Sequence, residues 1–129
     1  KAVGKVLPQM LGKLSGNAIR VPTPNVSLAI LSLNLKTATT VEELNEHMRQ
    51  AALHSPLRKQ IDYSNSPEVV SSDFVGSRHA CVFDSEATIV NGTHAILYCW
   101  YDNEFGYSCQ VHRILEQMAG VKYAVYPAE

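Results

Sequence analysis

The chain has 129 residues, enough for one domain of ordinary size and too few for two. Its 46% hydrophobic and 18% charged residues are typical of a globular protein, not of a disordered one. Eleven Lys and Arg stand against twelve Asp and Glu, and this net charge of −1 gives no support to binding of nucleic acid or of a membrane surface. The longest apolar run, residues 95–101, is far shorter than the roughly 20 residues of a membrane-spanning helix. We therefore expect neither a transmembrane segment nor a signal peptide.

The N-terminal part contains one predicted helix and two predicted extended segments. Apolar residues recur at helical spacing over residues 3–14, so we expect a helix there in which Pro8 either makes a kink or marks a first turn, with a stop near Gly16. Extended segments are predicted at 18–21 and 27–35, separated by a proline-rich turn. In the second of them leucines alternate with polar residues, which predicts a strand with one face on a core.

The middle of the chain predicts a helix followed by several short strands. Thr40 and Glu43 have the spacing of a capping box, and we expect a helix from there to about Ser55, just before a proline. Asn91 and Gly92 form the strongest hairpin signal, because both tolerate the positive φ of a type I′ turn. The predicted strands cover residues 59–63, 79–84, 87–90 and 93–101.

A last helix is predicted from about Asn103 to Met118, with Gly120 as its stop. Its predicted inward-facing stripe consists of Tyr107, Val111, Ile114, Leu115 and Met118. The tail, residues 121–129, shows no clear period. Strands grouped around hairpins, with helices between them, indicate an α+β fold: a mostly antiparallel sheet covered by helices on one face, with residues 1–129 as a single globular unit.

Common catalytic and metal-binding motifs are missing from the sequence. It has no G-x-G-x-x-G turn and no G-x-x-x-x-G-K-[ST] loop for nucleotide phosphates. The five histidines form no H-x-x-x-H or H-E-x-x-H pair, and Cys109 with His112 lacks the second pair that a zinc site needs, so we expect no metal. Cys81, Cys99 and Cys109 lack C-x-x-C spacing and are interpreted as free, buried thiols of a reducing cytoplasm. Spacing alone does not exclude a cysteine–histidine nucleophile pair, but packing accounts better for all three thiols.

Two segments stand out as candidate binding sites. Arg20 lies between apolar neighbours before a proline-rich turn. One interpretation is that its side chain projects into solvent or pairs with a Glu. The other is that it binds an anion, because a guanidinium matches phosphate oxygens with two parallel hydrogen bonds. Residues 100–108 pass from a strand directly into a helix. Asp102, Asn103 and Glu104 suit a helix cap, but four aromatic residues within this segment exceed what a cap requires. An asparagine at such a junction can also offer a donor and an acceptor to an amide-bearing ligand.

Four blocks of sequence carry a resemblance to a known family. They are Gly4-Lys-Val-Leu-Pro8 with Leu11-Gly-Lys-Leu14, Arg20-Val-Pro-Thr-Pro-Asn-Val-Ser27, Val70-Ser-Ser-Asp-Phe-Val-Gly76 and Trp100-Tyr-Asp-Asn-Glu-Phe-Gly-Tyr-Ser108. In this order they resemble the C-terminal part of the catalytic domain of phosphorylating glyceraldehyde-3-phosphate dehydrogenase, over about residues 1–119. The resemblance implies an oxidoreductase of glycolysis that converts glyceraldehyde 3-phosphate, NAD and inorganic phosphate to 1,3-bisphosphoglycerate and NADH.

The resemblance also implies roles for three residues. Arg20 is similar to the arginine that holds the phosphate of the sugar phosphate substrate. Asn103 is similar to the asparagine that hydrogen-bonds the nicotinamide carboxamide, and Tyr107 to the tyrosine that packs close to the nicotinamide ring. No residue of this chain matches a catalytic residue, because the family's nucleophilic cysteine and histidine base precede the matched segment.

By the same resemblance, the NAD-binding domain and the nucleophile-bearing segment are absent from these residues. We therefore expect the 129-residue chain to have no dehydrogenase activity by itself. The full-length parent is expected to be a cytoplasmic homotetramer that uses NAD; NADP is not excluded, because the residue that selects between them lies in the absent domain.

The sequence departs from the family pattern in a way that indicates a divergent branch rather than a different chemistry. Residues 29–33 lack the usual acidic residue, Cys109-Gln110 replaces a common Asn-Arg pair, and the tail after Gly120 runs past the usual end.

Two alternatives to this enzyme stay open. Erythrose-4-phosphate dehydrogenase is the nearest alternative, although Tyr101 and Phe105 favour the triose enzyme. A non-catalytic assembly or binding module is the other, because the family's sheets pack face to face in a tetramer.

Overall fold

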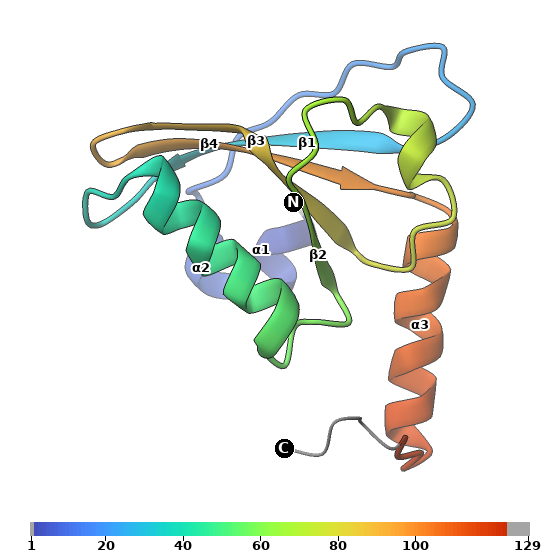
Figure 1. The fold of residues 1–129 in the computed structure, drawn as a ribbon. Coiled ribbons are helices and arrows are strands. Elements are labelled where there is room, and N and C mark those ends of the chain that lie inside the picture. Colours follow the sequence, from blue (N-terminus) through green and yellow to red (C-terminus); the bar gives the residue numbers. More distant parts are fainter. Residues whose placement is uncertain (1, 124–129) are drawn as a thin grey trace.

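The computed structural model describes residues 2–123 and contains one four-stranded sheet with helices attached to it (Figure 1). The strand order is β1-β4-β3-β2. β4 pairs antiparallel with both β1 and β3, whereas β2 pairs parallel with β3, so the predicted α+β fold with a mostly antiparallel sheet is confirmed. The elements are α1 (Ala2–Val6), the 3₁₀ helix η1 (Pro8–Met10), β1 (Ser27–Asn34), α2 (Val41–His54), β2 (Ile61–Ser64), the 3₁₀ helix η2 (Ser71–Phe74), β3 (Cys81–Asn91), β4 (His94–Tyr101) and α3 (Phe105–Met118).

One local prediction is confirmed in detail and a second in part. Thr40 caps α2 with a complete capping box: its hydroxyl accepts from the Glu43 N–H, and the Glu43 carboxylate accepts from the Thr40 N–H. The predicted hairpin joins β3 to β4, and Gly92 has a φ of 59° in its turn. Asn91 has no positive φ and is instead the last residue of β3, paired with His94, so the predicted type I′ turn with positive φ at both residues is wrong.

The predictions for the N-terminal segment are met only in part. In place of one helix over 3–14, α1 ends at Val6 and η1 begins at Pro8, because Pro8 lacks an N–H and clashes with the preceding turn. Pro8 thus marks a first turn, which is one of the two predicted roles, and the helical structure ends at Met10, well before Gly16. Residues 18–21 form no strand, since this segment pairs with none of the four strands.

In the middle of the chain, the predicted strands 79–84 and 87–90 are one continuous strand, β3, whose pairing with β4 is interrupted by a bulge between Asp84 and Ile89.

The core lies on both faces of the sheet. On one face α2 covers β3 and β4, where Leu44 and Met48 pack against a buried cluster of Phe83, Ala95, Leu97 and Cys99. On the other face, η2 places Phe74 over Trp100, with ring centroids 5.4 Å apart, beside buried Val26 and Val82. Successive strand residues alternate between the two clusters, as the pleat requires.

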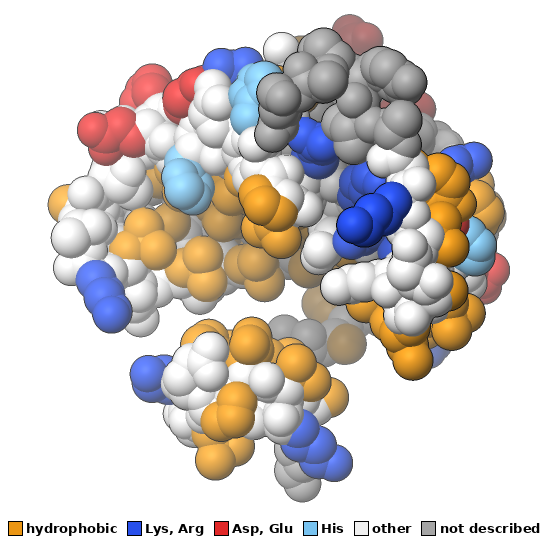
Figure 2. Space-filling model, turned by 90° about the horizontal axis from the view of Figure 1, so that it is seen from below, with side chains coloured by type: hydrophobic (Ala, Val, Ile, Leu, Met, Phe, Trp, Pro, Cys, Tyr) orange, Lys and Arg blue, Asp and Glu red, His pale blue; other side chains and the backbone are white. Residues whose placement is uncertain are grey.

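The last helix does not cover the sheet. α3 descends from the end of β4 and runs away from the sheet (Figure 1), and its only buried residue is Gly106. The predicted inward stripe is therefore exposed, from 42% at Val111 to 79% at Met118. Figure 2 shows the underside, where hydrophobic side chains gather beside the gap between the body and the smaller lobe formed by α1 and η1. Of the predicted tail, residues 121–123 form neither helix nor strand, and 124–129 lie outside the described residues.

Candidate functional site

The junction between β4 and α3 is organised around the carboxylate of Asp102. This side chain is only 2% exposed and accepts hydrogen bonds from the backbone N–H groups of Glu104 (3.0 Å), Phe105 (2.8 Å) and Gly76 (2.9 Å). The side chain of Asn25 contributes a further hydrogen bond. The bonds from Gly76 and Phe105 are the main causes that lower the pKa of Asp102 to about 2, because each N–H stabilises the charged form. Asp102 therefore caps α3 and joins three distant segments, while Glu104 contributes no side-chain cap.

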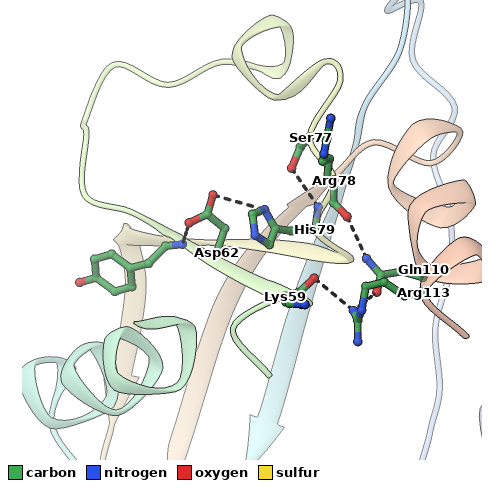
Figure 3. A network of polar contacts seen from close by, with 8 residues as sticks. Lys59, Asp62, Ser77, Arg78, His79, Gln110 and Arg113 are labelled. Carbon is green, nitrogen blue, oxygen red and sulfur yellow. Dashed lines mark hydrogen bonds and ion pairs between the residues drawn. The ribbon is translucent and has the colours of Figure 1, made fainter. Parts of the chain in front are cut away.

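α3 is held in direct contact with the loop that precedes β3. A Cβ on Gly106 would lie 2.8 Å from the carbonyl oxygen of His79, closer than real Cβ atoms approach. One turn later, Gln110 donates to the Arg78 carbonyl at 2.8 Å, and Arg113 donates to both Gln110 and the Lys59 carbonyl (Figure 3). These contacts fix the direction in which α3 leaves the sheet.

Asn103 is presented to solvent with its side chain held from one side. The Ser27 hydroxyl at the start of β1 donates to Asn103 Oδ1 at 3.2 Å. Within residues 2–123 the Asn103 amide nitrogen has no hydrogen-bond partner, so its two N–H groups are available to a ligand. The sequence predicts that Asn103 offers a donor and an acceptor to a ligand; in the structure its oxygen already accepts from Ser27 and its donors are open. The role of Asn103 in ligand binding stays a prediction.

The residue before Ser27 is strained. Val26 has a φ of 73°, although it is β-branched and 7% exposed. Such a backbone angle is a genuine outlier for valine and persists only where the surroundings enforce it. Val26 packs against Phe74 and Val82, while Asn25 and Ser27 on either side bond Asp102 and Asn103. The strain thus lies in the segment that connects Arg20 to the α3 junction.

Arg20 lies on the exposed segment that leads into β1, seven residues before Ser27. Within the described residues it makes no ion pair or hydrogen bond, so the interpretation as a partner of a Glu receives no support. The end of its segment reaches Asp102 and Asn103, but no contact joins Arg20 itself to Asn103 or Tyr107. Tyr107 lies on α3, four positions after Asn103, and is 71% exposed.

Comparison with known proteins shows which family the sequence of this chain matches. The sequence model described as "Glyceraldehyde 3-phosphate dehydrogenase, C-terminal domain" matches residues 1–103. The chain belongs to this family. The match extends from α1 to Asn103 and includes Arg20, Val26 and Ser27.

Named relatives agree with this family. A glyceraldehyde-3-phosphate dehydrogenase-like protein of Pseudomonas aeruginosa is 66% identical over 126 residues, which cover 98% of this chain and 27% of the relative. The glyceraldehyde-3-phosphate dehydrogenases of Schistosoma mansoni and Glossina morsitans morsitans are each 46% identical, over 96% and 92% of this chain and 36% and 35% of their own length. The chain thus spans about a third, or less, of the length of these relatives.

Other candidate sites receive no support from the described part of the chain. Residues 2–123 contain no group of three His, Cys, Asp or Glu side chains that could hold a metal ion. None of the helices in that range is long and apolar enough to cross a membrane. A surface hollow of about 340 Å³ lies at the far end of α3, lined by residues that include Lys59, Arg113 and Tyr123, and so does not include Arg20 or Asn103.

Sequence reasoning missed the residues that support Asn103. It treated Asp102 as one of three possible caps and gave Asn25, Val26 and Ser27 no role beyond the resemblance. The signal for Asp102 was local, since an aspartate three residues before a helical stretch is a typical cap. Ser27 gave no such signal, because it lies 76 positions before Asn103 in the sequence and reaches it only through the pairing of β1 with β4.

Proposed function

We propose that this chain forms the part of a phosphorylating glyceraldehyde-3-phosphate dehydrogenase that binds the substrate phosphate and the nicotinamide of NAD. The proposed overall reaction converts glyceraldehyde 3-phosphate, NAD and inorganic phosphate to 1,3-bisphosphoglycerate and NADH. The observation that carries the proposal is the Asn103 amide, held by Ser27 through its oxygen with its donors open, in a chain that belongs to this family.

Arg20 is proposed to bind the phosphate of the substrate. Its guanidinium has no partner among residues 2–123 and is exposed, so all its donors are available to an anion. No acidic side chain competes for it within that range. An arginine in this state suits two parallel hydrogen bonds to phosphate oxygens, which is the geometry that distinguishes arginine from lysine.

Asn103 and Tyr107 are proposed to hold the nicotinamide end of NAD, which supplies the hydride acceptor. The open N–H groups of Asn103 suit the carboxamide oxygen, and the Ser27 bond limits rotation of the amide. The exposed ring of Tyr107 on α3 offers an apolar face to a flat ring. The open N–H donors of Asn103 fit the nicotinamide end of NAD. Asn103 and Tyr107 do not select between NAD and NADP.

The residues of this chain are proposed to bind and orient, and not to perform the covalent chemistry. Cys99 is buried, Cys81 is partly buried and Cys109 lies on α3, and none of them contacts Arg20 or Asn103. The nucleophilic cysteine and the histidine base are proposed to come from the remainder of a longer protein. Such a protein would act as a homotetramer in the cytoplasm, and the exposed Ile30 and Ile89 of the sheet provide apolar surface suited to assembly.

A chimeric enzyme tests this proposal. The matching region of the Schistosoma mansoni enzyme is replaced by this chain, and NADH formation is measured with glyceraldehyde 3-phosphate, NAD and phosphate. We expect turnover that requires all three, and no turnover by the chain alone. A chimera that folds and binds NAD but forms no NADH would overturn the proposal. Faster turnover of erythrose 4-phosphate would instead favour the alternative enzyme, which the names of the relatives do not support.

A further inference from the structure

Two of the three cysteines lie next to each other in the sheet. Cys81 is the first residue of β3, and Cys99 lies on β4 opposite Phe83. Because side chains alternate along a strand, Cys81, Phe83 and Cys99 all point to the face that α2 covers. Cys81 packs against the core cluster that contains Cys99, and each thiol shifts the pKa of the other. The two thiols are therefore neighbours on one face of the sheet, and the proposed dehydrogenase chemistry does not use them.

The surroundings suit a thiol pair that a small oxidant can reach. Cys99 is 8% exposed, whereas Cys81 at the strand end is only partly buried, so the contact lies near the surface. The hydrogen bond from Cys81 lowers the pKa of the Cys99 thiol and raises that of Cys81, because the donated proton stabilises the Cys99 thiolate. The third cysteine, Cys109, lies on α3 and is not part of this pair.

The backbone positions suit a bond that forms with a small adjustment. Diagonal neighbours on paired strands have Cα atoms about 7–8 Å apart, slightly more than the roughly 4.4–6.8 Å of ordinary disulfides. Cys81 precedes the first antiparallel pair between β3 and β4, Val82 with Trp100, so no β4 residue pairs with it. On its other side Cys81 pairs with Ile61 of β2 and donates its N–H to the Gln60 carbonyl at 3.1 Å, so closure of the bond requires the end of β3 to shift with β2 or β4 to move towards it. A disulfide made under such strain is more readily reduced than an unstrained one.

We propose that Cys81 and Cys99 are a reversible redox pair that closes to an intramolecular disulfide when a peroxide oxidises it. One thiolate attacks the peroxide: an S–O bond forms, the O–O bond breaks, and the leaving hydroxide takes up a proton to become water. The second thiol then attacks the sulfenic sulfur, so that the S–S bond forms, the S–O bond breaks, and a second water leaves with the thiol proton. The two thiols lose two electrons, which reduce one hydrogen peroxide to two waters.

The test uses the complete chain with Cys109→Ser, so that the third thiol cannot react. The protein is treated with hydrogen peroxide, alkylated with iodoacetamide under denaturing conditions, and digested after Glu86, which lies between the two cysteines. We expect one joined pair of peptides that lacks two hydrogens and carries no alkyl group, and dithiothreitol should restore two alkylatable thiols. A further Cys81→Ser substitution should abolish the joined peptide; because Cys81 is only partly buried, this variant should keep the fold, as circular dichroism checks.

Each other outcome contradicts the proposal. Two alkylated thiols after peroxide treatment would show that the pair does not react. Separate peptides that gain oxygen would show over-oxidation of isolated thiols, and a disulfide found only between two chains would show that the sulfurs do not meet within one molecule. A joined peptide that persists in the Cys81→Ser variant would exclude this pair as its source.

Discussion

At the scale of single residues, Asp102 has the largest structural role at the site. Asp102→Asn removes the charge that four hydrogen-bond donors approach, and we expect a loss of roughly 2–3 kcal/mol in the free energy of unfolding near pH 7. The pKa of Asp102 is lowered to about 2 in the folded chain, so its contribution is complete above the ordinary value of about 4 and is lost as the pH falls from there towards 2.

Urea unfolding at several pH values checks this expectation. The difference between the native chain and Asp102→Asn should narrow as the pH drops below about 4. Asp62→Asn is the matched control: Asp62 is exposed and lies 3.5 Å from His79, so its substitution should change the free energy of unfolding by less than about 1 kcal/mol. A difference for Asp102→Asn that stays constant down to pH 2 would contradict the role assigned to the charge.

Val26 offers a second test at this scale. Glycine normally destabilises a chain by about 0.5–1 kcal/mol more than alanine does, but a φ of 73° should reverse that order. We expect Val26→Gly to be more stable than Val26→Ala in thermal unfolding. Val82 packs in the same cluster but lies within β3. At that position the ordinary order of stability should hold, with Val82→Ala more stable than Val82→Gly. The same order at both positions would show that Val26 is not strained.

The sequence singled out Asn103 and Arg20 as candidate binding residues, but it did not predict which residues support the Asn103 amide. Both residues stand out locally, by residue type and by their place beside a turn or a helix start. Ser27 and Asn25 reach the junction only because β1 pairs with β4, and no local pattern encodes a contact between such distant strands. Resemblance, and not spacing, supplied the roles of Arg20, Asn103 and Tyr107.

At the scale of elements, the start of α3 depends on close approach to the 77–79 loop. Gly106→Ala places a Cβ 2.8 Å from the His79 carbonyl oxygen, so the helix or the loop must shift. We expect a net loss of about 1–2 kcal/mol in the free energy of unfolding, because overpacking exceeds the gain in helix propensity.

Gly16→Ala is the matched control for that substitution. A Cβ at Gly16 would have no neighbour within 4 Å, so this change should be neutral or slightly stabilising. Thermal unfolding of the two variants measures the contrast. Equal melting temperatures would mean that α3 does not rest on the loop as described.

The predicted elements succeeded where the signal was local and failed where it was not. The capping box of α2 and the hairpin near Gly92 depend on neighbouring residues and are confirmed, although Asn91 belongs to β3 and not to the turn. The spacing of apolar residues in α3 correctly predicted a helix with an apolar stripe, but not that this stripe would face solvent. In the segment 3–14, Pro8 begins a new turn as one of its two predicted roles requires, but the apolar pattern wrongly extended the helix beyond Met10.

At the scale of the whole molecule, exposed apolar surface is the dominant feature. α3 leaves most of its large apolar side chains uncovered, and the underside beside α1 is hydrophobic (Figure 2). Monomeric proteins rarely expose such continuous surface. The chain spans 27% to 36% of the length of the relatives named above. In the proposed function, this chain forms one wall of a site that other residues complete.

If Arg20 binds the phosphate of the substrate, as proposed, its substitution should affect phosphorylated and unphosphorylated substrates differently. In the chimeric enzyme, Arg20→Ala should lower kcat/KM for glyceraldehyde 3-phosphate roughly 10–100-fold, the worth of one or two charge-assisted hydrogen bonds. It should leave kcat/KM for unphosphorylated glyceraldehyde nearly unchanged. Arg49→Ala is the control, because Arg49 pairs with Glu46 on the surface of α2 and should affect neither substrate.

The comparison of these two aldehydes with the Arg20→Ala chimera tests the central claim most directly. A loss of kcat/KM confined to the phosphorylated aldehyde is the predicted result. An equal loss for both aldehydes, or no loss for either, would contradict the assignment of Arg20 as the residue that binds the substrate phosphate.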